Sequence, residues 1–257
     1  MTVHSITFDI DKCQFLLLNF VAMSLKGIFP IDRWDFDSQS LLKELPPEDY
    51  HILMRNSYEK TCIKGEIVFR EGAAPQGIYL IRQGKIKKYK IDNYGKEQII
   101  YVANTGELIG YHAVLADEPY PDSAAALEST VLVFIPKQDF LHVLDHSRTL
   151  SRSLLRTLSH EFGVLANSIS VSAHRPVRER LAISLLVLRE KFKAETPDGE
   201  RVAVNVSRDD IAGMVGATRE NVVRLLRDFK DEKLIETRGR KIYILDLKRL
   251  AEVSNYT

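Results

Sequence analysis

Cysteine is scarce in this sequence, and this excludes several kinds of metal site. The 257 residues contain two cysteines, Cys13 and Cys62, whereas an iron–sulfur cluster or a Cys₄ zinc site is built on four thiolates. Because we expect the protein to lie in the cytoplasm, where disulfides are rare, we expect both thiols to be free. The sequence therefore predicts no metal site and shows no evident cofactor.

Long apolar runs are also missing. The longest is Phe15–Val21, which Asn19 interrupts, and a membrane-spanning helix needs about 20 apolar residues. A signal peptide would carry basic residues before such a run, yet Asp9 and Asp11 stand there. We expect this run to pack on the body of the protein, or to precede a translation start at Met23. Both interpretations predict a cytoplasmic protein without a membrane partner.

The motifs of common enzyme classes are absent as well. No HExxH zinc motif, GxSxG nucleophile motif or phosphate-binding Walker motif occurs in the sequence. We therefore expect that the protein is not an enzyme.

The net charge is close to zero but divides unevenly along the chain. Residues 174–257 hold 18 basic and 14 acidic residues, while residues 1–173 hold 18 and 21. A positively charged C-terminal third favours contact with a polyanion such as double-stranded DNA. A difference of this size also occurs on ordinary solvated surfaces, so charge alone does not decide the function.

Residues 64–136 have the pattern of a small antiparallel β structure. Short runs rich in β-branched and aromatic residues alternate with glycine or polar turns. The runs are Ile67–Phe69, Ile78–Ile81, Lys85–Ile91, Gln98–Val102 and Thr130–Ile135. Asp92–Gly95 separates two of them like a hairpin loop. We predict a β-roll or jelly roll over residues 41–137, preceded by an N-terminal extension over residues 1–40.

Residues 138–173 then change to a helical period, with apolar residues every three or four positions. These form one stripe of Leu150, Leu154, Leu158, Phe162, Leu165 and Ile169. Near-heptad spacing predicts the seam of a homodimer, although a helix lying on its own barrel has a similar pattern. Pro176 starts another helix, which places a hinge at Ser172–Arg175.

Residues 174–257 have the order of a winged helix-turn-helix domain. The predicted elements are a helix at Val177–Phe192, a turn at Thr196–Gly199, a strand at Arg201–Val206 and two helices within Ser207–Ile235. A basic hairpin follows, with Glu236–Thr237, a turn at Arg238–Arg240 and a strand at Lys241–Leu245. The whole chain is therefore predicted to be an α+β protein with a β-roll sensor domain, a long dimerisation helix and a DNA-binding domain.

The two short helices carry the functional prediction. Ser207 and Thr218 suit the N-cap positions, and Gly216 suits the sharp turn between the helices. Apolar residues mark the inward face of the second helix, namely Val222, Leu225, Leu226 and Phe229. This spacing is typical of a helix-turn-helix unit.

The outward face of the second helix is predicted to read bases in the major groove. Arginine can bond guanine O6 and N7, and glutamate can accept from the cytosine amine, which points to Arg219, Glu220 and Arg224. Contacts to the DNA backbone are predicted for Ser207, Thr218, Arg227, Arg238, Arg240 and Lys241. The plain alternative is a solvated helix face with a Glu220–Arg224 pair. A signalling module whose C-terminal domain contacts proteins is the alternative function.

Two patterns resemble the CRP/FNR family. Ala217–Arg224 (ATRENVVR) is similar to its recognition helix, with Arg219, Glu220 and Arg224 at matching base-reading positions. The family's cyclic-nucleotide-type β-roll has a similar glycine series, found here as Gly72, Gly84, Gly95, Gly106 and Gly110. The resemblance covers about residues 40–250. It implies a homodimer on an inverted repeat with TGTGA-like half-sites, transcription activation and contact with RNA polymerase.

The positions that match the family's cyclic-nucleotide pocket depart from its pattern. The candidate effector-pocket residues are Gly110, Tyr111, His112, Asp122, Ser123, Ala124 and Leu165. By resemblance, Tyr111 replaces a ribose-binding glutamate and Asp122 replaces a phosphate-binding arginine, which reverses the local charge. Leu165 offers no hydrogen bond to adenine, so cAMP is disfavoured. The effector is either an unknown small molecule beside Ala113–Pro121 or absent, with that loop filling the pocket.

Overall fold

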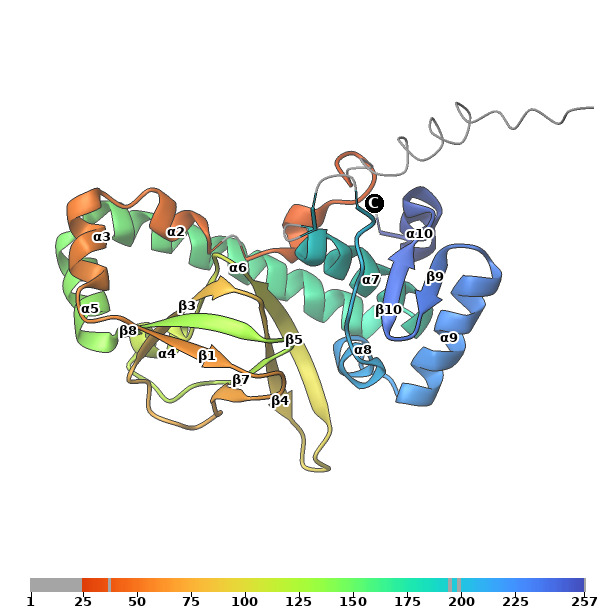
Figure 1. The fold of residues 1–257 in the computed structure, drawn as a ribbon, viewed down its shortest axis with the longest axis horizontal. Helices are drawn as coiled ribbons and strands as arrows, with labels where there is room; N and C mark the ends of the chain where they lie inside the picture. The colour runs from red at the N-terminus through yellow and green to blue at the C-terminus, as the bar shows by residue number, and fades with distance from the viewer. Residues whose placement is uncertain (1–24, 37, 194–195, 198–199, 257) are drawn as a thin grey trace, which may run out of the picture.

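The computed structural model describes residues 25–36, 38–193, 196–197 and 200–256. A β-roll lies at one end of the molecule, a long helix runs along it, and a helical domain with a small hairpin lies at the other end (Figure 1). The run Phe15–Val21 and most of the N-terminal extension lie outside the described residues, as do Cys13 and the tip of the turn expected at Thr196–Gly199.

The β-roll consists of two four-stranded antiparallel sheets, with strand orders β1-β8-β3-β6 and β2-β7-β4-β5. The strands are β1 Tyr58–Cys62, β2 Ile67–Phe69, β3 Gly77–Gln83, β4 Lys85–Ile91, β5 Glu97–Asn104, β6 Leu108–Ile109, β7 Ser123–Ala126 and β8 Thr130–Pro136. The five predicted runs are confirmed as β2, β3, β4, β5 and β8. Strands β1, β6 and β7 were not predicted. Strand β7 is mostly alanine, which is a weak strand former.

Two glycines of the predicted series are required by their turns. Gly84, between β3 and β4, has a φ of 100°, and a Cβ there would lie 2.6 Å from Thr130 Oγ1. Gly110 has a φ of 85° and precedes helix α4, Tyr111–Ala116. A glycine adopts such angles without the steric cost that other residues pay, so this part of the series has a physical cause.

Short helices cover one end of the roll. They are α2 Ser40–Lys43, α3 Pro47–Met54 and α5 Lys137–His146. The short 3₁₀ helix η1, Ile31–Trp34, lies instead against the helices Arg148–His174 and Val177–Lys193. Helix α3 packs against α5, and α2 packs against the long helix α6, Arg148–His174. Leu53, Ile135 and Phe140 belong to the apolar cluster that these helices share with the roll.

The single helix predicted over residues 138–173 is wrong, because α5 and α6 are separate helices. Ser147 interrupts them with φ −96° and ψ 102°, and its Oγ accepts a hydrogen bond from the Leu150 N–H at 3.3 Å. A serine that caps the next helix competes with continuation of the previous one. A break between helices is confirmed at Arg175, where α6 ends in extended geometry, while the hinge expected at Ser172–Arg175 stays a prediction.

The predicted dimer stripe on α6 is partly wrong. Leu150 and Leu154 are 1% and 3% exposed and pack inside their own chain, so they are unavailable to a partner. Leu155, Phe162 and Ile169 are 67%, 76% and 69% exposed. With the partly buried Leu158 and Leu165, these form a heptad stripe one residue away from the buried face, and Leu155 was missed.

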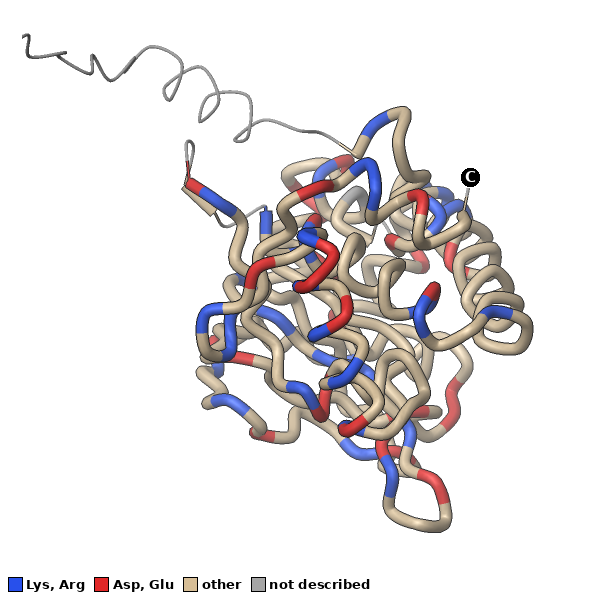
Figure 2. The backbone as a smooth tube through the Cα atoms, turned by 90° about the vertical axis from the view of Figure 1, so that its right-hand side faces the viewer, with Lys and Arg blue, Asp and Glu red and all other residues tan. Residues whose placement is uncertain are grey.

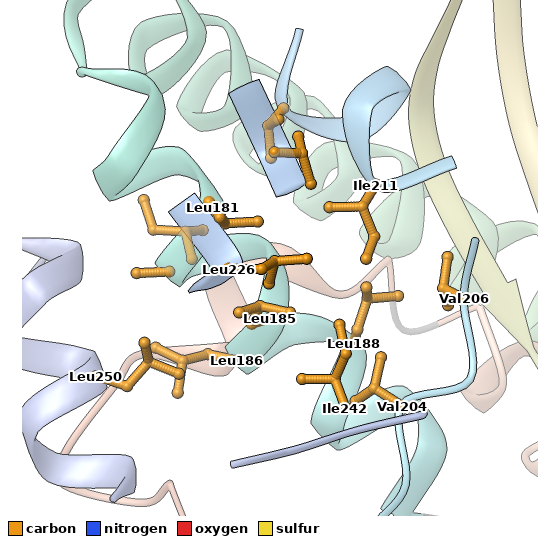
Figure 3. Packing of buried hydrophobic residues seen from close by; sticks show 14 of the residues in the cluster. Leu181, Leu185, Leu186, Leu188, Val204, Val206, Ile211, Leu226, Ile242 and Leu250 are labelled. Carbon is orange, nitrogen blue, oxygen red and sulfur yellow. The ribbon is translucent and has the colours of Figure 1, made fainter. Parts of the chain in front are cut away.

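The C-terminal domain is a winged helix-turn-helix unit with a dense apolar core (Figure 3). Its elements are α7 Val177–Lys193, α8 Arg208–Val215, α9 Arg219–Asp231, β9 Ile235–Arg238, β10 Lys241–Ile244 and α10 Leu247–Ser254. Leu185, Leu226 and Ile242 meet in this core. The strand expected at Arg201–Val206 is wrong, since only Val204 forms a bridge, to Ile242.

The C-terminal domain packs directly against the β-roll. Its buried cluster includes Tyr89, Ile99 and Val102 of the roll, and α8 contacts β5. Gly213 on α8 permits this close approach, because a Cβ there would lie 3.0 Å from the Glu97 carbonyl oxygen. The recognition unit is thus held by the roll as well as by the chain connection.

A nearly buried ion pair crosses the same contact. Lys87 Nζ lies 2.9 Å from Asp210 Oδ1 and also contacts the Glu97 carboxylate. Burial, which raises the pKa of Asp210, is outweighed by the hydrogen bond from Ser207 and by Lys87. The pKa of Asp210 therefore lies below its ordinary value of 3.8.

Protonation of Asp210 is expected to weaken the folded protein in acid. Because its folded-state pKa is depressed, its charge contributes stability above pH 3.8 that is lost as the pH falls through the folded-state pKa. The free energy of unfolding in urea should therefore drop less for Asp210→Asn than for the wild type between neutral pH and about pH 3. Asp209→Asn, at an exposed neighbour, should behave like the wild type. Equal drops in all three proteins would contradict this assignment.

Candidate DNA-binding surface and sensor interior

The helix-turn-helix unit is built by two serine- and threonine-capped helices. The Ser207 Oγ accepts from the Asp210 N–H at 3.0 Å, and the Thr218 Oγ1 accepts from the Asn221 N–H at 3.3 Å. Gly216 ends α8 with a φ of 61°. Both predicted caps and the turn glycine are confirmed, so local sequence sets where α9 begins and which way it points.

Helix α9 has one buried face and one exposed face. The inward residues Val222, Leu225, Leu226 and Phe229 are buried as predicted. The exposed residues are Arg219, Glu220, Val223, Arg224 and Arg227. Neither the β-roll nor the rest of the described chain covers this face, which therefore carries three arginines and one glutamate into solvent.

The base-reading arginines contact other side chains of the chain only at its exposed surface. Arg219 Nε lies 3.5 Å from Asp209, and Arg224 lies 3.6 Å from Asp228. Arg224 also donates to Asn221 Oδ1 at 2.8 Å in an exposed hydrogen bond. Exposed ion pairs contribute about 0–1 kcal/mol, so both guanidinium groups can exchange these partners at small cost. The Glu220–Arg224 pair considered from the sequence is not formed between these described side chains.

The hairpin β9–β10 forms the wing. Arg238 pairs with Lys241 across the strands, and Arg240 at the turn is exposed. Arg238 Nε donates to Glu236 at 2.6 Å, a partner that the sequence pattern did not indicate. Arg240 and Lys241 are therefore the freer cations for a phosphate. Basic and acidic residues are interspersed on this side of the molecule (Figure 2), so no single sign of charge dominates it.

The predicted phosphate contact by Ser207 is weakened by the structure. Its hydroxyl donates to the Asp210 carboxylate while accepting from the Asp210 N–H, so its proton is already used within the chain. Thr218 and Arg227 are exposed and stay accessible.

In the β-roll domain, Tyr111 and His112 meet a buried carboxylate on the long helix. The Tyr111 hydroxyl donates to Glu161, and His112 Nε2 lies 2.6 Å from Glu161 Oε2. Glu161 is 2% exposed. Burial and the neighbouring carboxylate raise the pKa of Tyr111 above its ordinary value. Helix α4 and α6 are thus tied together by hydrogen bonds in the chain's interior.

Asp122 has a different partner. Its carboxylate lies 3.2 Å from Lys88 Nζ, with both side chains about nine-tenths buried. The same Lys88 Nζ lies 5.9 Å from the ring of Phe36, and Phe36 stacks on Tyr101 with ring centroids 3.7 Å apart and an interplanar angle of 5°. Charge and aromatic groups of the chain itself therefore occupy the space beside Asp122.

The sequence-predicted effector residues have two different sets of partners: Tyr111 and His112 contact Glu161, and Asp122 contacts Lys88. Most of the predicted residues are buried, namely Gly110, Tyr111, Asp122, Ser123 and Ala124, while His112 and Leu165 are partly buried. Glu161, Lys88 and Phe36 were missed by sequence reasoning. Glu161 lies on the inward side of α6 together with Leu154, so a second helical stripe in the sequence was an available signal for it.

The described part of the chain was compared with the requirements of a metal site and of a membrane-spanning helix. No three or more His, Cys, Asp or Glu side chains are grouped to hold a metal ion there. None of the described helices is long and apolar enough to span a bilayer. Cys62 is a buried free thiol, and burial raises its pKa, which lowers its reactivity. Cys13 lies outside the described residues.

Comparison with known families matches the two domains separately. Residues 59–147 match the cyclic nucleotide-binding domain and residues 179–253 match the Crp-like helix-turn-helix domain. The chain is 29% identical over 196 residues to the fumarate and nitrate reduction regulatory protein of Vibrio cholerae, covering 76% of this chain and 78% of that protein. It is 30% identical over 183 residues to the transcriptional activator protein Anr of Pseudomonas protegens, covering 71% and 75%.

Solved structures share the fold. A CRP/FNR-family transcriptional regulator from Eubacterium rectale aligns with a TM-score of 0.66 at 21% identity, over 84% of this chain and 97% of that one. FixK2 from Bradyrhizobium japonicum aligns with a TM-score of 0.66 at 20% identity, over 77% and 96%. The two sequence relatives are named as regulators and not as enzymes. With this fold, these two domains and these relatives, the chain belongs to the CRP/FNR family of DNA-binding transcription regulators.

Proposed function

We propose that this protein binds an inverted-repeat DNA site as a homodimer and so regulates transcription. The observation that carries the proposal is the exposed face of α9, where Arg219, Glu220 and Arg224 stand opposite a fully buried apolar face. A helix anchored in this way fits the major groove with its first turns against the base edges. Arginine and glutamate supply complementary donors and acceptors for a G·C pair.

Contacts to the DNA backbone are proposed around this helix. Arg227 follows on the same helix, and Arg240 and Lys241 project from the wing. Cationic side chains beside a recognition helix bind phosphates and fix its register without reading sequence. We therefore propose that the wing contributes affinity for DNA of any sequence, and that the start of α9 discriminates between DNA sequences.

The homodimer is proposed to form along α6. Leu155, Phe162 and Ile169 leave a heptad stripe exposed on a described helix, and such stripes bury themselves against a second helix. A symmetric seam gives a two-fold axis. Two recognition helices on that axis reach major grooves about 34 Å apart, which requires an inverted repeat. The matching residues favour TGTGA-like half-sites.

We further propose that cAMP is not the effector. Binding it would require breaking the Lys88–Asp122 pair and displacing the stacked Phe36 and Tyr101. A phosphate would then face the uncovered Asp122 carboxylate. Any effector is therefore a different small molecule, or none is needed.

The mode of regulation is proposed to be activation in the cytoplasm through contact with RNA polymerase. A relative with 30% identity over most of both chains is named a transcriptional activator, which supports this assignment.

Base reading is tested by comparing Arg219→Ala with Arg240→Ala. A duplex selected from a random pool and a scrambled duplex would each be titrated across a salt series. Arg219→Ala should cost about 1–3 kcal/mol on the selected duplex and little on the scrambled one. Arg240→Ala should weaken both duplexes alike and reduce the salt slope by about one. Equal losses on both duplexes for Arg219→Ala would remove the base-reading role, whereas failure of the wild type to bind any duplex would favour a protein-binding C-terminal domain.

The dimer seam is tested by charge insertion into the exposed stripe. Leu155→Asp with Phe162→Asp should give monomers in sedimentation equilibrium and abolish specific DNA binding, because two buried like charges would face their symmetry mates. Ser170→Asp, at an exposed position beside the stripe, is the matched control and should stay dimeric. A dimeric double variant would place the interface elsewhere.

The cAMP exclusion is tested by ligand stabilisation. A ligand that binds the folded state raises stability by RT ln(1 + [L]/Kd). Millimolar cAMP should therefore leave both the Tm and the DNA affinity unchanged. A saturable calorimetric signal on adding cAMP would overturn the exclusion.

A further inference from the structure

Residues 25–36, here called the clasp, cross from one domain to the other. They precede the β-roll in sequence, yet their first part lies on the C-terminal domain and α6 before the chain passes to the roll (Figure 1). The family-domain matches begin at residue 59, so neither matched domain includes this segment. Its contacts with both domains indicate that it helps to hold them together.

The first part of the clasp is embedded in the C-terminal domain. Leu25 and Phe29 are buried in the same apolar cluster as the core of α7 and α9. Trp34 packs edge-on against Tyr256, which follows α10, with ring centroids 5.4 Å apart, and Phe29 lies 5.8 Å from the same ring. Segments near both ends of the described chain therefore meet on one domain.

The middle of the clasp is fastened to α6. The Arg33 carbonyl accepts from the Asn167 amide at 3.3 Å, and the Asp35 carbonyl accepts from His160 Nε2 at 2.8 Å. These contacts satisfy backbone groups along the side of α6 that does not carry the exposed heptad stripe.

The last residue of the clasp enters the β-roll. Phe36 is 5% exposed and joins the cluster that contains Ala124 and Val164. Its ring stacks on Tyr101, and its N–H donates to the Tyr101 hydroxyl at 3.0 Å. Phe36 thus fills the interior of the roll beside the residues that match a family ligand pocket.

A buried charge cluster joins the clasp, the roll and α7. Lys191 Nζ lies 2.6 Å from Asp35 Oδ1, 2.7 Å from Glu107 Oε1 and 2.6 Å from the Tyr101 hydroxyl. Lys191 is 4% exposed. Asp35 belongs to the clasp, whereas Glu107 and Tyr101 belong to the roll. An ammonium group buried this far is stable only while its partners stay in place.

We propose that the clasp is a built-in device that fixes the C-terminal domain on the β-roll, with Phe36 occupying the roll's interior in place of a diffusible ligand and Asp35 closing on Lys191. Docked in this way, the domain exposes the outward face of α9. The inference that the clasp orients the C-terminal domain for DNA rests on the proposed function. The inference that the clasp couples the two domains mechanically does not.

The coupling is tested in the full-length protein by backbone hydrogen exchange. Asp35→Asn with Phe36→Ala removes the charge contact and the stacked ring. The matched control, Asp32→Asn with Phe140→Ala, removes a carboxylate from the same segment and a buried ring from helix α5, outside the clasp. Clasp release should raise exchange at least about tenfold in α7, α8 and β5, since local opening sets exchange. The control should leave these elements unchanged.

DNA affinity is measured on the same proteins. Apparent affinity falls with the fraction of molecules in the competent orientation, so the clasp variant should bind the selected duplex about tenfold more weakly while the control changes less than about twofold. If the double variant does not fold, Asp35→Asn alone replaces it, because this carboxylate is 42% exposed. The single variant should also raise hydrogen exchange and lower DNA affinity.

The outcomes separate the two hypotheses. Exchange in α7, α8 and β5 that is identical in wild type and clasp variants would overturn the coupling. Faster exchange with unchanged DNA affinity would overturn the orienting role. Failure of the wild type to bind any duplex would remove the proposed function, while the exchange result would still decide whether the clasp couples the domains.

Discussion

The arrangement of the whole chain depends on helix α6 having two different apolar faces. The inward face runs through Leu150, Leu154 and Val164, which are buried against the chain's own domains. The outward face, through Leu155 and Phe162, remains exposed. Because an α-helix turns 100° per residue, neighbouring leucines in one stretch of sequence serve opposite surfaces. One helix therefore completes the β-roll and leaves an exposed apolar stripe, the seam of the proposed homodimer.

The same helix contacts both the interior of the β-roll domain and the clasp that lies on the C-terminal domain. Glu161, on the inward face, receives hydrogen bonds from the start of α4, and His160 and Asn167 hold the backbone of the clasp. A buried carboxylate leaves its site only at a large free-energy cost. A shift of α4 therefore has to move α6 or break a buried hydrogen bond. This constraint holds whether or not a small molecule is bound.

Much of this architecture could be predicted where local chemistry decides the structure. The caps Ser207 and Thr218 and the turn at Gly216 define the helix-turn-helix unit from sequence alone. The limits of prediction are equally physical. Leu154 and Leu155 both fit a helical stripe, and only tertiary packing decides which is buried. The partners of Lys191 are separated from it by more than 80 residues, and no local pattern signals such a meeting.

Buried charges then determine how precisely the two domains sit together. Apolar packing between Ile99 and the C-terminal core is non-directional and tolerates small rotations. An ammonium group held by Asp35, Glu107 and Tyr101 has one arrangement in which all partners are satisfied. Burial, which lowers the pKa of Lys191, is outweighed by the two carboxylates, so its pKa is raised and its charge persists. In the proposed coupling, the apolar surfaces supply the non-directional attraction between the domains, and the charge cluster selects one orientation from those that the apolar surfaces allow.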